Sequence, residues 1–124
     1  MMKRLIIYFG LLFIAGVILN GCYKDVISPD IEYPPQAVSF NKDLAPLFAS
    51  RCTDVGCHVT GGHVPYMDDP TKSFHNIVGG GYVNTTFPKD SRFYEFVYGE
   101  MSQYTSKEER LKVYDWIRNG AKNN

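Results

Sequence analysis

The sequence predicts a small all-α domain, with about four short helices and long connecting loops. Four segments place apolar residues at helical spacing, and each has a residue suited to begin or end a helix. Strand signals are poor, because the one candidate, residues 81–85, is short and flanked by glycine. The chain has 124 residues, which is enough for one domain.

The first two helices are expected before and after a long loop. The first covers residues 42–51, and Pro46 fits only in its first turn, so the regular part is expected to begin there. The second covers residues 70–78, with Asp69 as the N-cap. Gly79 is expected to end this helix in the left-handed conformation.

The last two helices carry clearer capping signals. The third is expected over residues 92–98, with Ser91 as the N-cap. The fourth is expected over residues 107–119, where Ser106 and Glu109 match the spacing of a capping box. A glycine follows each of these helices and is expected to stop it.

The N-terminus has the features of an export signal. Residues 5–19 are apolar and follow a positive start, but the run is shorter than the roughly 20 residues of a membrane-spanning helix. It ends in Leu19-Asn20-Gly21-Cys22, which resembles the lipobox of bacterial lipoproteins. That resemblance implies a signal peptide over residues 1–21 and a lipid on Cys22. The alternative is an uncleaved N-terminal anchor, and both place the rest of the chain outside the cytoplasm.

The remaining chain divides into a tether and a domain. Residues 22–38 contain three prolines and are expected to be an extended, lipidated tether, and residues 39–124 are expected to form the domain. Tyr23 follows the lipid cysteine where an Asp would resemble an inner-membrane retention signal, which favours the outer membrane. With 13 basic and 13 acidic residues, the chain offers no electrostatic case for binding nucleic acid.

The chemical centre of the sequence is Cys52-Thr53-Asp54-Val55-Gly56-Cys57-His58. A C-x-x-C-H run is the mark of covalent haem attachment, in which two thiols bind haem vinyl groups and the histidine binds the iron. The spacing here is C-x4-C-H, so two extra residues must bulge out, and Gly56 would permit the bulge.

Three other interpretations of this cluster stay open. Cys52 and Cys57 are able to form a plain disulfide in an oxidising compartment. Cys52, Cys57, His58 and His63 are candidate zinc ligands, although adjacent Cys57 and His58 suit one small tetrahedral ion poorly. A cysteine paired with a histidine is also a candidate nucleophile, although no orienting partner is evident.

With these residues, the chain resembles the small monohaem c-type cytochrome domains of bacterial, Bacteroidetes-type lipoproteins. The resemblance covers about residues 38–122 and rests on the order of several motifs. They are Val38-Ser39-Phe40, Asp43-Leu44-Ala45-Pro46-Leu47-Phe48, Cys57-His58, Gly80-Gly81-Tyr82-Val83-Asn84 and Trp116-Ile117-Arg118-Asn119-Gly120-Ala121.

The resemblance implies a class I-like cytochrome c fold around one covalent haem c. His58 would be the proximal ligand and Met101, shortly before the last helix, the distal ligand, although the usual neighbouring proline is missing. Met67, His63 and His75 are the rival distal ligands, and an open distal site is the remaining alternative.

The expected function is electron transfer to a redox partner protein by a membrane-anchored carrier that is not an enzyme. The alternative is a non-haem lipoprotein binding module with a Cys52–Cys57 disulfide.

Overall fold

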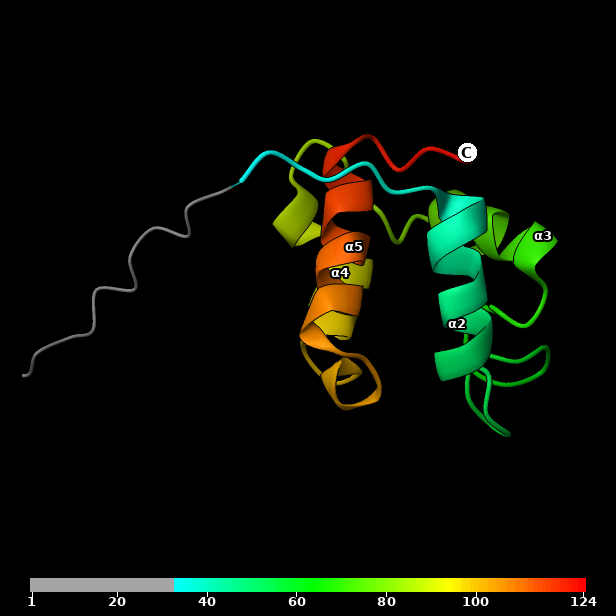
Figure 1. Cartoon of the computed structure of the whole chain (residues 1–124). Helices are drawn as coiled ribbons and strands as arrows, with labels where there is room; N and C mark the ends of the chain where they lie inside the picture. The colour runs from blue at the N-terminus through cyan, green and yellow to red at the C-terminus, as the bar shows by residue number, and fades with distance from the viewer. Residues whose placement is uncertain (1–32) are drawn as a thin grey trace, which may run out of the picture. The chain divides into compact units, whose positions relative to one another are not determined.

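The structure is a computed structural model that describes residues 33–124. This part of the chain holds four α-helices, long loops and short π- and 3₁₀-helical turns, and no strand (Figure 1). The α-helices are α2 (Ala45–Arg51), α3 (Pro70–Phe74), α4 (Arg92–Tyr98) and α5 (Lys107–Arg118). The all-α class is confirmed, and residues 81–85, the candidate strand, form an irregular loop.

The first helix begins earlier than the sequence predicts, because a π-helical turn precedes it. This turn, η1 (Phe40–Leu44), is capped from both sides. The Ser39 hydroxyl accepts a hydrogen bond from the N–H of Lys42 at 3.2 Å, and the Asp43 carboxylate accepts one from the N–H of Ser39 at 2.8 Å. Pro46 lies in the first turn of α2, where its missing N–H costs no helical hydrogen bond, as predicted.

The second helix starts as predicted and ends differently. The Asp69 carboxylate caps α3 by accepting from the N–H of Thr71 at 2.9 Å. The helix then continues as a π-helical turn, η2 (His75–Gly79), and the left-handed residue is Gly81 at a φ of 76°. Gly79 serves close packing instead, because a Cβ there would lie 3.1 Å from the His75 ring.

The last two helices differ in how they begin. Ser91 is the N-cap residue of α4, but its buried hydroxyl caps nothing, because it accepts from the N–H of Asn84 at 2.8 Å and donates to the Asn84 carbonyl at 3.1 Å. Ser91, the predicted cap, therefore links α4 to the preceding loop through its two hydrogen bonds with Asn84. At α5 the capping box of Ser106 and Glu109 is confirmed, and Gly120 follows the helix at a φ of 91°.

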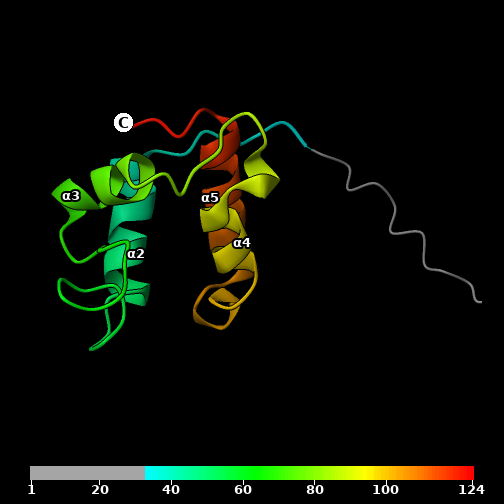
Figure 2. The same cartoon turned by 180° about the vertical axis from the view of Figure 1, so that it is seen from behind.

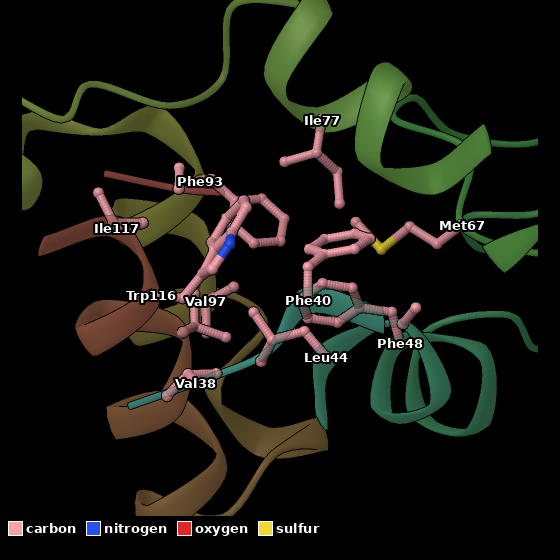
Figure 3. Close-up of a cluster of buried hydrophobic side chains, with 13 residues drawn as sticks. Val38, Phe40, Leu44, Phe48, Met67, Ile77, Phe93, Val97, Trp116 and Ile117 are labelled. Atoms are coloured by element: carbon pink, nitrogen blue, oxygen red, sulfur yellow. The ribbon is translucent and has the colours of Figure 1, made fainter. Parts of the chain in front are cut away.

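The core brings together buried side chains of η1, α2, η2, α4 and α5 around one phenylalanine (Figure 3). Phe40 has no exposed surface, and its ring centroid lies 5.2 Å from that of Phe74, 5.3 Å from that of Trp116 and 6.2 Å from that of Phe48. Trp116 is also buried, and its indole N–H donates to the Lys122 carbonyl at 2.9 Å. Aromatic rings of this size supply much of the apolar area that stabilises a small domain.

The chain enters this packed unit at Pro34, before the expected boundary at residue 39. The N–H of Gln36 donates to the Asp115 carboxylate at 3.2 Å, and the Gln36 carbonyl accepts from the Asn119 amide at 2.8 Å. Both partners lie at the end of α5, so the last residues of the expected tether are fixed to the domain.

Asn124 completes the same end of the unit. Its backbone carbonyl accepts from the Ser39 hydroxyl at 2.6 Å and from the N–H of Asn41 at 2.9 Å. Its side-chain oxygen accepts from the N–H of Phe40 at 2.9 Å. These bonds satisfy backbone donors that the start of a helix leaves without helical partners.

Candidate functional site

The Cys-Cys-His segment begins at the end of α2. Cys52 is the C-cap residue of that helix, and its carbonyl accepts from the N–H of His58 at 2.9 Å. Between them, the N–H of Cys57 donates to the Asp54 carbonyl at 2.8 Å, which closes a β-turn.

The two extra residues of the long spacing, Val55 and Gly56, are the corners of this turn. Gly56 has a φ of 84°, which an L side chain would strain, and Val55 is fully exposed. The two extra residues therefore protrude into solvent, and the N–H of His58 still donates to the Cys52 carbonyl.

Cys52 and Cys57 are both half-buried and both free. Burial, together with the smaller effects of the charges on Cys57 and Glu109, raises the pKa of the Cys52 thiol to about 11. The Cys52 thiol is therefore neutral at physiological pH, which is unfavourable for a nucleophile or a thiolate metal ligand.

The His58 ring is held by a backbone carbonyl. Its Nδ1 lies 3.0 Å from the carbonyl oxygen of Pro65, which is buried. A carbonyl oxygen only accepts hydrogen bonds, so in the neutral ring Nδ1 carries the proton and Nε2 keeps a lone pair for a ligand. Histidines that bind metals almost always donate their second ring N–H in this way.

The loop that supplies this carbonyl is tied back on itself. The N–H of Met67 donates to the His58 carbonyl at 2.7 Å, and the N–H of His63 donates to the Cys57 carbonyl at 2.8 Å. Pro65 was not predicted as a site residue. It acts through a backbone oxygen, which every residue carries, so its identity gives no signal in the sequence.

The rival distal ligands lie in different surroundings. Met67 is only 3% exposed and packs in the core beside Phe48 and Ile77, where a thioether fills space (Figure 3). His63 is exposed on the loop. His75 is also exposed and lines an open pocket of about 320 Å³ between η2 and the segment around Pro65.

Met101 is half-buried in the loop between α4 and α5. Its N–H donates to the Phe96 carbonyl at 2.9 Å, and its carbonyl accepts from the N–H of Tyr104 at 3.1 Å. Gly99 turns the chain out of α4, where a Cβ would lie 2.7 Å from the Glu95 carbonyl oxygen. The predicted distal ligand is thus on a short loop that is fixed at its start by backbone hydrogen bonds.

The Cys-Cys-His loop and the Met101 loop lie at the same end of the packed unit. Figures 1 and 2 show the loop after α2 and the loop between α4 and α5 at one end, opposite the segment that enters at residue 34. The Nε of Arg51, the residue before Cys52, lies 3.4 Å from Oε1 of Glu109. This ion pair links the end of α2 to the first turn of α5.

One polar atom near Met101 lacks a partner within the protein. The hydroxyl oxygen of Thr105, four residues after Met101, is buried and forms no hydrogen bond. Buried hydroxyl groups are normally hydrogen-bonded, so an unsatisfied one at this loop fits a site completed by a bound polar group.

The described residues do not provide a tetrahedral zinc site. Within residues 33–124, no three His, Cys, Asp or Glu side chains gather closely enough to hold a metal ion. The four proposed zinc ligands are therefore not brought together. Two free thiols, which are able to attach vinyl groups, and one histidine nitrogen, which is able to bind iron, do fit a covalently bound haem.

The expected lipid site, Cys22, and the apolar segment 5–19 lie outside the described residues. Among the helices that the structure does describe, none is long and apolar enough to cross a membrane.

No protein-family model, no curated protein and no solved structure matches this chain.

Proposed function

We propose that this chain is an electron carrier with one covalent haem c. The observation that supports the proposal best is the His58 ring, because its Nδ1 proton is committed to Pro65 and its Nε2 is kept for a ligand. The adjacent Cys57 and the nearby Cys52 are free thiols, as haem attachment requires.

Each thiol would attach the haem by adding across one of its vinyl groups. The sulfur forms a bond to one vinyl carbon, and the thiol hydrogen ends on the other carbon. No electron is gained or lost, so the addition itself needs no external oxidant. The exposed turn at Val55 and Gly56 would take up the extra chain length while Cys52 and Cys57 reach their two vinyl groups.

When bound, the haem supplies an iron that cycles between the ferric and ferrous states. The residues of this chain set how readily that happens. His58 would hold the iron through Nε2, with its ring orientation fixed by the Pro65 carbonyl, and Met101 is the second proposed ligand. A thioether raises the reduction potential relative to a second imidazole. Electron transfer of this kind needs no residue to act as a general acid or base.

The proposed carrier is attached to a membrane through Cys22 and faces the periplasm or the cell exterior. It exchanges electrons with a redox partner protein. Several acyl chains on one cysteine would make the attachment long-lived, since each buried CH₂ adds about 0.8 kcal/mol.

The proposal is tested by producing the domain together with a haem maturation system and titrating it with a reductant. We expect a red protein whose visible spectrum changes in one reversible, one-electron step. His58→Ala should disturb that spectrum, whereas His63→Ala, an exposed residue of the same loop, should leave it unchanged. A colourless protein would contradict the proposal and favour the non-haem binding module.

A further inference from the structure

Arg110 makes three contacts with the chain segment that contains Met101. It is half-buried in the first part of α5. Its Nη1 donates to the Ser102 carbonyl at 2.9 Å and to the Thr105 carbonyl at 2.5 Å. Its guanidinium lies 5.8 Å from the centroid of the Tyr98 ring, so one side chain contacts both ends of the loop.

These contacts add to a loop that is otherwise held unevenly. On the α4 side, the N–H of Met101 and the N–H of Gly99 bond to carbonyls of the helix at 2.9 and 2.8 Å. On the α5 side, the N–H of Thr105 reaches the Ser102 carbonyl only at 3.4 Å. Arg110 bonds to the carbonyls of both Ser102 and Thr105, so it adds two charge-assisted hydrogen bonds on that side.

We propose that Arg110 is the positioning residue of the Met101 loop. It holds the loop closed, so that the sulfur of Met101 stays available to the iron and other ligands are kept out. This inference rests on the proposed haem function and on Met101 as the distal ligand. Arg110 itself does not bind the iron.

Arginine and lysine should differ in how well they hold the loop from this position. The guanidinium carries five N–H donors on a planar group, and it also stacks on aromatic rings. A lysine ammonium keeps the positive charge but is a compact point charge on a flexible stem. Lysine should therefore restore the loop only in part.

The test uses the ferric holoprotein and added imidazole, which competes with Met101 for the iron. Loss of the weak near-infrared sulfur-to-iron band reports displacement of the sulfur. We expect Arg110→Gln to lower the imidazole concentration for half-displacement by about tenfold. The variant lacks the two charge-assisted hydrogen bonds that must break when the loop opens, so its loop opens more easily. Arg110→Lys should give a smaller decrease, between the wild type and the glutamine variant.

A control separates positioning from general stability. Asn119→Ala removes the hydrogen bond to the Gln36 carbonyl near the other end of α5. It should lower the unfolding temperature and leave imidazole binding unchanged.

Equal imidazole binding by wild type and Arg110→Gln would overturn the inference. Should the glutamine variant fail to fold, equal binding by wild type and Arg110→Lys would overturn it as well. Failure of the proposed function has a different signature: the wild-type protein would lack the sulfur-to-iron band, or Met101→Ala would retain it.

Discussion

The two ends of the packed unit are stabilised in different ways. The end where the chain enters is joined by buried rings, including Phe40 and Trp116, and by the bonds of Gln36 and Asn124. The opposite end carries half-buried cysteines and Met101 on loops held by backbone hydrogen bonds and a few charged side chains. Buried rings therefore hold the fold at one end, and the side chains proposed to bind the haem lie at the other end.

The largest expected effect is at the packed end. Trp116→Ala removes a buried indole and the bond to the Lys122 carbonyl, and it should cost about 3–5 kcal/mol of the free energy of unfolding. Chemical denaturation measures this. Leu111→Ala, at a site on the same helix that is 45% exposed, should change the free energy by no more than about 0.5 kcal/mol. Similar losses in the two variants would contradict the core described here.

The two methionines provide the sharpest contrast between the ends. Met67→Ala should cost about 2–5 kcal/mol of stability, because Met67 is 3% exposed, and should keep the near-infrared sulfur-to-iron band. Met101→Ala should cost less stability, lose the band and open the iron to carbon monoxide. Denaturation and ferric absorption spectra of both variants check this. Loss of the band in Met67→Ala alone would reverse the ligand assignment.

A smaller, pH-dependent effect is expected where the ends of α2 and α5 meet. The pKa of Glu109 is lowered mainly by the hydrogen bond from the backbone N–H of Ser106, and also by the Ser106 hydroxyl and Arg51. A carboxyl whose pKa is lower in the folded protein stabilises it above the ordinary pKa, and that stability disappears as the pH falls through the folded value.

Glu109→Gln tests this contribution, because glutamine also serves in a capping box. The variant should be less stable than the wild type at pH 7, and the difference should vanish under acidic conditions below the folded pKa. Denaturation at a series of pH values measures it, with Glu108→Gln, on the exposed side of the helix, as the control. A constant difference across the pH range would mean that the Glu109 charge does not contribute.

The sequence predicted the helices well where capping chemistry is local. Asp69 and the Ser106–Glu109 box bond to backbone groups within three residues, so their spacing alone identifies the helix starts. The packing of residues 34–38 depends on Asp115 and Asn119, far along the chain, and the Ser91 hydroxyl bonds to Asn84 in the preceding loop and not to its own helix. No local pattern encodes those partners.

In the candidate site, too, residues in a local motif were predicted and residues that act through contacts elsewhere in the chain were not. Cys52, Cys57 and His58 were found because their order is itself a motif. Pro65 and Arg110 were missed, since one contributes a backbone oxygen and the other bonds to carbonyls of a neighbouring loop. Their roles arise only when the chain folds.

The central claim is that this chain holds one haem through two thioether bonds, and the mass of the denatured, reduced protein tests it most directly. Produced with a haem maturation system, the protein should have the mass of the polypeptide plus one haem, and the haem should stay on the peptide that contains Cys52, Cys57 and His58. An alkylating reagent should find neither of these thiols. A protein with the polypeptide mass alone, and with Cys52 and Cys57 both alkylated, would contradict the claim.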